Sequence, residues 1–298
     1  MKKTIRKLIN SLGYDISIQP IASNQSDSNK KVTFIHIPKC GGISIDTALR
    51  EQLGRPGQGK IKRGPMIASS LFSYASELNS LEEQAAFSEF HAKRIQDTLV
   101  YHLNLRWQYV SGHVNVSNAI LRHFSQHYHF ITLLRDPVER FISNYIFNKV
   151  TNTQRIMPPF KDDNPLTEEQ LVKEVDELLA SKRGWHMANT PTMFITGRYP
   201  KDSADAESIS EEFIENLKCF SVVGFLDNLP DFEQRCFALL NKPISVRALN
   251  RTADMNNAYD LFVQKTLKDY FSEPAVRRKV EELCQFELKN YELARELM

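Results

Sequence analysis

The segment HIPKCGG at 36–42 combines residue types that bind an anion through backbone and side chain together. Lys39 carries a positive charge on a flexible stem, and glycines let backbone amides approach a bound group closely. The amides that open a helix attract phosphate and sulfate for a related electrostatic reason. We therefore expect an anionic group to be bound by Lys39, Cys40, Gly41, Gly42, Ile43 and Ser44.

A plain strand-to-helix turn with a surface lysine explains the same loop about equally well. The segment also departs from the nucleotide-triphosphatase pattern GxxxxGK[ST], because its lysine precedes its glycines. The loop on its own therefore indicates an anion site without identifying the anion.

A second segment, LLRDPVERFISNY at 133–145, places an arginine and a serine where both can reach one ligand. Arg135 offers a planar fork of donors that suits phosphate, and Ser143 lies roughly two helical turns later. The alternative is that Arg135 pairs with Asp136 or Glu139 and that Ser143 is a small residue packed between helices. The segment predicts a second anion contact through Arg135 and Ser143.

Both segments directly follow short apolar runs that are typical of buried parallel strands. We predict strands at 32–37, 109–114, 129–134, 220–226 and 244–249. Helical spacing, a proline suited to a first turn and a capping box predict helices over 43–53, 78–96, from Pro137 to 147, from Thr167 to 180, over 229–240 and over 274–298. Alternating strands and helices favour an α/β fold, with a parallel sheet flanked by helices on both faces.

The polar residues 21–31 predict a boundary between a flexible lead-in, residues 1–31, and a single domain over residues 32–298. The stretch 55–63, rich in glycine and cations, is expected to be an exposed, mobile loop whose four positive charges could bind an anionic substrate.

The composition limits the class of protein and its surroundings. A net charge of +2 is too small to indicate nucleic acid as a partner. The four cysteines are scattered without a CxxC pair, and the chain shows neither a secretory signal nor a long apolar run, so we expect a cytoplasmic protein. The basic N-terminus could make weak peripheral membrane contact, although a frayed helix explains it more simply. The oligomeric state is not determined.

Taken together, the two anion segments resemble the sulfotransferases that use 3′-phosphoadenosine 5′-phosphosulfate (PAPS). The likeness is to the carbohydrate branch that includes heparan sulfate 2-O-sulfotransferase and its bacterial relatives. Ile37 to Ser44 matches the family's xPKxxxxS, which grips the 5′-phosphosulfate, and Arg135 to Tyr145 matches RDPxxRxxSxY, which grips the 3′-phosphate. The resemblance implies a P-loop-like fold, PAPS as donor co-substrate and a hydroxyl acceptor, which the carbohydrate branch implies is on a glycan.

A third segment, SGHVN at 111–115, resembles the family's HGH element, whose second histidine is the general base. The resemblance places His113 in that role and Ser111 where the family has its first, substrate-orienting histidine. It also makes Lys39 catalytic, as the group that meets charge on the leaving oxygen, with no metal required. A packed histidine is the alternative for His113.

The late segment ALNRTADMN resembles, more weakly, the family's loop over the 3′-phosphate. It adds Asn250, Arg251 and Thr252 as donor-binding candidates, although a solvent loop explains them almost as well.

The acceptor is the least determined partner. Cations at 60–63 with Trp107 and Trp185 are compatible with an anionic sugar chain, but loop cations and core tryptophans are the simpler explanation. Lipid or tyrosine hydroxyls are other acceptors within the same class. Outside it, a nucleotide-dependent kinase would require Mg²⁺, and a non-catalytic nucleotide- or glycan-binding module would need no base.

Overall fold

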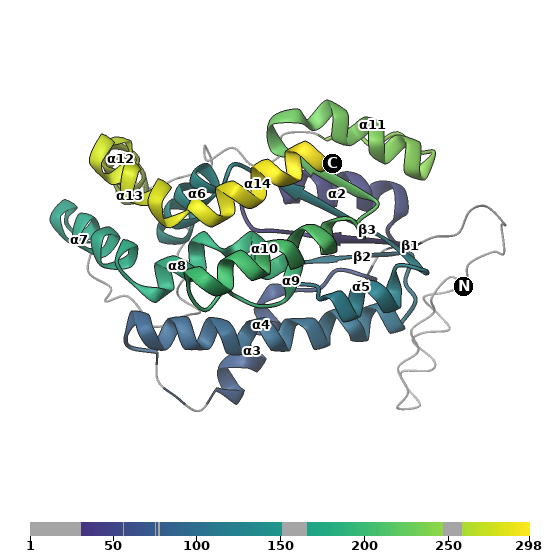
Figure 1. Cartoon of the computed structure of the whole chain (residues 1–298), viewed down its shortest axis with the longest axis horizontal. Helices are drawn as coiled ribbons and strands as arrows, with labels where there is room; N and C mark the ends of the chain where they lie inside the picture. The colour runs from purple at the N-terminus through teal and green to yellow at the C-terminus, as the bar shows by residue number, and fades with distance from the viewer. Residues whose placement is uncertain (1–30, 56, 75, 77, 151–165, 247–257) are drawn as a thin grey trace, which may run out of the picture.

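The computed structural model describes residues 31–55, 57–74, 76, 78–150, 166–246 and 258–298 (Figure 1). Its sheet has four parallel strands in the order β2-β1-β3-β4. The strands are β1 (Lys31–Ile35), β2 (Tyr109–Gly112), β3 (Tyr128–Leu134) and β4 (Val222–Phe225). Because all four strands run the same way, the loops that follow them meet at one edge of the sheet.

Helices cover both faces of this sheet. On one face α2 (Gly42–Leu53) and α11 (Leu229–Leu240) pack through Leu49 and Phe232 against Phe34 and Leu133. The other face is covered by α4 (Leu81–Asn104), α5 (Asn118–Phe124), α9 (Thr190–Thr196), α10 (Ser203–Leu217) and α14 (Gln285–Leu297). This arrangement confirms the predicted α/β fold with a P-loop-like parallel sheet.

A third apolar cluster lies beyond the sheet edge and joins helices from distant parts of the chain. It is formed by α6 (Pro137–Val150), α7 (Glu168–Leu179), α8 (Lys182–Ala188), α12 (Ala258–Ser272) and α13 (Pro274–Leu283). Phe141 of α6 and Leu267 of α12 are fully buried in it. The cluster therefore holds α12 against α6, the helix that carries Ser143.

Several predicted elements are confirmed with close boundaries. The predicted helix at 229–240 is α11, and Pro137 opens α6. Thr167 and Gln170 form the expected capping box: the Gln170 amide donates to Thr167 Oγ1 at 3.3 Å and the Thr167 amide to Gln170 Oε1 at 2.8 Å.

Two predicted elements are wrong in their described parts. Residues 244–246 form no strand, and the rest of that segment lies outside the described residues. The expected C-terminal helix over 274–298 is divided at Cys284 into α13 and α14. In addition, α3 (Arg63–Ser73) and the run α8 to α10 were not predicted. For α8 and α9 the reason is that short helices buried on several sides lack a clear apolar stripe.

The expectation of a mobile loop at 55–63 is wrong for residues 59–61, which lie along the free edge of β2. The Ser111 amide donates to the Gly59 carbonyl and the Ile61 amide donates to the Ser111 carbonyl, both at 2.8 Å. Gly59 has a φ of 72°, and a Cβ atom there would collide with the Tyr109 carbonyl. These contacts fix Lys60 and the start of α3 beside the sheet.

Among the described residues, no helix has both the length and the apolar character needed to cross a membrane. Residues 1–30 lie outside the described part of the chain, so the lead-in, its membrane contact and the single-domain division stay predictions.

Candidate functional site

The loop between β1 and α2 has the backbone geometry of an anion site. Lys39 and Gly41 both adopt left-handed conformations, with φ of 67° and 75°. Gly41 is the N-cap of α2 and has no side chain to cap it, and the first turn of α2 contains no acidic residue. Gly42 lies against the His36 ring, where any Cβ atom would collide with the imidazole. The opening of α2 is thus left without a side-chain cap or a carboxylate of its own, as an anion site requires.

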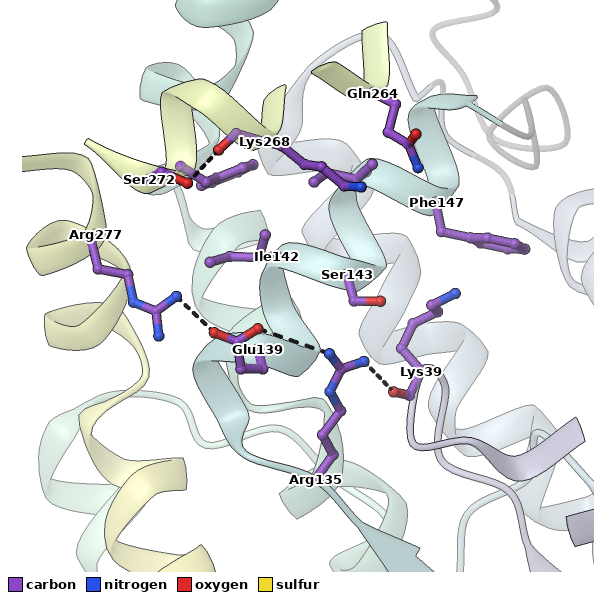
Figure 2. A pocket seen from close by; sticks show the side chains of 12 residues that line it. Lys39, Arg135, Glu139, Ile142, Ser143, Phe147, Gln264, Lys268, Ser272 and Arg277 are labelled. Carbon is purple, nitrogen blue, oxygen red and sulfur yellow. Dashed lines mark hydrogen bonds and ion pairs between the residues drawn. The ribbon is translucent and has the colours of Figure 1, made fainter. Parts of the chain in front are cut away.

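The side chains of this loop divide between the cavity and the core. Lys39 extends into a cavity, with its Nζ 3.9 Å from the centre of the Phe147 ring (Figure 2). Cys40 is 1% exposed, and burial raises the pKa of its thiol to about 12. Of the predicted anion-binding residues, Cys40 can therefore contribute only its backbone.

The end of β3 is tied directly to this loop. Arg135 Nη1 donates to the Lys39 carbonyl at 3.1 Å, so one guanidinium bridges the two predicted anion segments. Asp136 does not pair with it but caps α6, accepting from the Glu139 amide at 2.8 Å. The contact from Arg135 Nη2 to Glu139 is long, at 3.9 Å, whereas Arg277 approaches the same carboxylate at 2.8 Å. The other N–H groups of the Arg135 guanidinium therefore remain directed toward the cavity.

A cavity of about 410 Å³ collects side chains from both segments. Lys39, Arg135 and Ser143 all line it, as the sequence patterns predicted (Figure 2). The structure adds Phe147 from α6, Gln264 and Lys268 from α12, and Arg277 from α13. The only sequence signal for the α12 pair was their helical spacing of four residues, which carries no information about what the helix faces.

His113 follows β2 and has a defined tautomer. Its Nδ1 lies 2.8 Å from the His36 carbonyl, which can only accept, so Nδ1 carries the proton and Nε2 is the free acceptor. Burial, followed by the fields of His36 and Arg63, lowers the pKa of His113 well below 6.5. The imidazole is neutral at physiological pH and can accept a proton through Nε2.

His36 is the residue near His113 that the sequence patterns did not identify. The two imidazoles lie 4.1 Å apart between ring centres, and burial with the charge of Lys60 lowers the pKa of His36 to about 4. The available signal was its position directly after β1, since neighbouring parallel strands end at the same edge. His113 does not line the 410 Å³ cavity; it is joined to the β1–α2 loop through His36.

Ser111 does not take the position of a second imidazole beside His113. Its side chain faces α2, where its hydroxyl donates to Asp46 and accepts from Arg50. Tyr109 donates to the same Asp46 carboxylate at 2.9 Å. Alternation along a strand directs Tyr109 and Ser111 to one face of the sheet, so Ser111 belongs to a structural network.

Two other predicted features have structural roles. Trp185 donates from Nε1 to the Pro200 carbonyl at 3.0 Å and packs edge-on against Phe286, which favours the core explanation for this tryptophan. Arg140, the second arginine of RDPVERFIS, is fully buried and donates to the Met187 and Ala188 carbonyls that end α8. Asn250, Arg251 and Thr252 lie outside the described residues.

Comparison with known proteins agrees with this geometry. The model of the Sulfotransferase family matches residues 25–294 of the 298, a range that contains both loops, His113 and the helices around the cavity. No curated protein matches the chain significantly. Since the family match covers most of the sequence, the chain belongs to the sulfotransferase family.

Proposed function

We propose that this sulfotransferase takes its sulfuryl group from PAPS and delivers it to a carbohydrate hydroxyl, as in the branch that includes heparan sulfate 2-O-sulfotransferase. The observation that carries the proposal is the convergence of Lys39 and Arg135, from two separate strand ends, on one cavity. PAPS is the donor that the sulfotransferase family normally uses.

The lining of the cavity fits a donor with two anionic ends. Its charged side chains are four cations and one carboxylate, Glu139, which already contacts Arg277 and Arg135. In our proposal, Lys39 and the amides that open α2 hold the 5′-phosphosulfate, while Arg135 and Ser143 hold the 3′-phosphate. The loop with Asn250, Arg251 and Thr252 is proposed to close over the same phosphate.

The donor supplies an activated sulfuryl group on a phosphate that leaves readily. His113 accepts the proton of the acceptor hydroxyl at Nε2 while the hydroxyl oxygen bonds to sulfur. As the bond from sulfur to the bridging oxygen breaks, negative charge grows on that oxygen, and Lys39 with the amides of residues 40–44 stabilises it. The role of His36 is to hold the His113 tautomer through its carbonyl.

An acidic sugar is the acceptor that the surroundings of His113 support best. Arg63 at the start of α3 is exposed, Arg183 of α8 is half-buried, and neither makes an ion pair among the described residues. The positive charge of Arg63 contributes to lowering the pKa of His113. The charge of Arg183 in turn contributes to lowering the pKa of Arg63. The pKa of His113 is lowered by Arg63 and raised by the more weakly acting Asp46, so the positive field is the stronger of the two. Two cations that make no ion pair near the proposed base favour an acceptor that carries negative charge near its hydroxyl.

The donor assignment is tested by calorimetric titration of the purified protein with 3′-phosphoadenosine 5′-phosphate and with ATP. We expect the bisphosphate to bind at least tenfold more tightly, about 1.4 kcal/mol. A smaller preference would refute the donor assignment, and turnover abolished by a chelator would favour the kinase.

The acceptor assignment is tested with sulfur-labelled PAPS and a panel of acidic oligosaccharides, neutral oligosaccharides, tyrosine peptides and hydroxylated lipids. Label should enter the acidic oligosaccharides most rapidly, and Arg63→Ala should raise the KM for them more than it changes kcat. Label found mainly on a peptide or lipid would refute the carbohydrate assignment and leave the donor assignment intact.

A further inference from the structure

One face of α12 lines the cavity that α6 lines from the other side. Gln264, Lys268 and Ser272 follow one another at intervals of four residues, which places them on a single side of a helix. In Figure 2 the Lys268 side chain extends from α12 into the cavity, and the Gln264 amide points toward Phe147. Sequence patterns predicted no contribution from this helix to the donor site.

Lys268 faces the cavity without a counter-charge. No carboxylate lies within 4.0 Å of its Nζ among the described residues, and the one acidic residue of the cavity, Glu139, is engaged by Arg277 at 2.8 Å. Lys39 is in the same situation, and burial together with the charge of Arg135 lowers its pKa. Cations that share a cavity repel one another, and a bound polyanion offsets that repulsion.

Gln264 presents an unsatisfied hydrogen-bond donor to the same space. Its Nε2 atom is buried and has no acceptor in the described structure. A buried donor without a partner is unfavourable, because it has lost its hydrogen bonds to water without replacing them. A ligand that brings an acceptor to this point recovers that energy.

We infer that α12 completes the donor site: Lys268 pairs with the 3′-phosphate from the side opposite Arg135, and Gln264 donates a hydrogen bond to the adenosine part. This inference rests on the proposed function. Under this inference, Lys268 makes the site selective for a nucleotide with a 3′-phosphate over one without it. Position supports this assignment, because Lys268 lines the same cavity as Arg135 and Ser143, the proposed 3′-phosphate contacts, and reaches it from a different helix.

The experiment compares two nucleotides that differ only in the 3′-phosphate, 3′-phosphoadenosine 5′-phosphate and adenosine 5′-phosphate, by calorimetry. Lys268→Met should weaken the bisphosphate at least tenfold and the monophosphate less than threefold. The matched control is Lys265→Met, on the same helix but exposed and outside the cavity, which should leave both affinities within twofold. Lys268→Arg should restore most of the bisphosphate affinity, which a variant damaged only in folding would not do.

Gln264→Met, which keeps the volume of the side chain and removes the donor, should weaken both nucleotides by a similar factor of about three to ten. Equal losses for the two nucleotides in Lys268→Met would overturn the 3′-phosphate assignment, and unchanged affinity in that variant would overturn the role of α12. If the wild-type protein itself fails to prefer the bisphosphate, the proposed donor is wrong, and this result is distinguishable from the other two.

Discussion

The cavity lined by Lys39 and Arg135 and the pair His36 and His113 lie at the same edge of the sheet, yet their side chains differ in charge. Around the cavity, Lys39, Arg135 and Lys268 are cations. Beside β2, His36 and His113 are neutral, because burial lowers the pKa of His36 to about 4 and that of His113 well below 6.5. Burial also lowers the pKa of Lys39, so the same physical effect acts in both regions.

The two side chains respond differently because lysine and histidine have different pKa values before burial. A lysine begins at a pKa of 10.5 and a histidine at 6.5, so a downward shift leaves the lysine far more room to stay protonated at neutral pH, while the larger downward shift at His113 favours its neutral form. A transfer enzyme needs this division, since one region must attract an anionic donor while the other must accept a proton. Under the proposed function, the choice of residue type lets one sheet edge serve both tasks.

The largest effect is expected from removing the proposed base, His113. His113→Gln should lower kcat by about 10²–10⁴ while the affinity for 3′-phosphoadenosine 5′-phosphate stays within twofold, because His113 does not line the donor cavity. Single-turnover kinetics and calorimetry measure the two quantities. The control is His127→Gln, at an exposed histidine. A change in affinity alone would show a binding module without catalysis.

Removing the cation nearest the proposed leaving group should have the next largest effect. Lys39→Met is expected to lower kcat by about 10²–10³, since its charge acts most strongly on the charge that develops in the transition state. Steady-state kinetics with labelled donor provide the measurement, with the exposed Lys93→Met as control. An unchanged kcat would remove Lys39 from the catalytic role.

Arg135 should affect binding more than turnover. Arg135→Lys keeps the charge but loses the fork that reaches both the Lys39 carbonyl and the cavity. We expect donor affinity to fall about tenfold, or 1.4 kcal/mol, with kcat changed less than threefold. A larger loss in kcat than in affinity would contradict the division of roles between Arg135 and Lys39.

The pH profile tests the neutral state of His113 directly. A base acts above its own pKa, and burial lowers the pKa of His113 well below 6.5. The value of kcat/KM should therefore be flat from pH 8 down to 6.5 and decline only at lower pH. An acid limb centred at 6.5 or above would show that the imidazole is solvated in the working enzyme.

The smallest effect is expected at Glu287, a buried acidic residue outside the cavity, and concerns how stability depends on pH. Glu287 is 2% exposed, and burial raises its pKa from 4.5 to about 7 despite hydrogen bonds from Thr192. Between these values the folded state holds a proton that the unfolded state releases, so this group makes stability fall as pH rises through that window. Glu287→Gln should flatten the slope, by at most roughly 3 kcal/mol over the window. Urea unfolding at pH 5 and pH 7 measures the difference, and identical slopes in both proteins would contradict it.

The sequence alone determined the elements whose causes are local. An apolar run predicts a strand, Pro137 suits a first helical turn, and Thr167 with Gln170 caps α7, all through neighbours a few residues away. The two anion segments were predictable for the same reason, because strand, loop and helix follow one another directly at Lys39 and Arg135.

Only the tertiary structure decided which distant residues join these segments. His36 meets His113 because β1 and β2 are parallel neighbours, and Ser111 turns away because of the face on which β2 places it. Lys268 reaches the cavity because the apolar cluster around Phe141 and Leu267 holds α12 against α6. Such pairings depend on the packing of many side chains from distant parts of the chain, and a short stretch of sequence does not specify that packing.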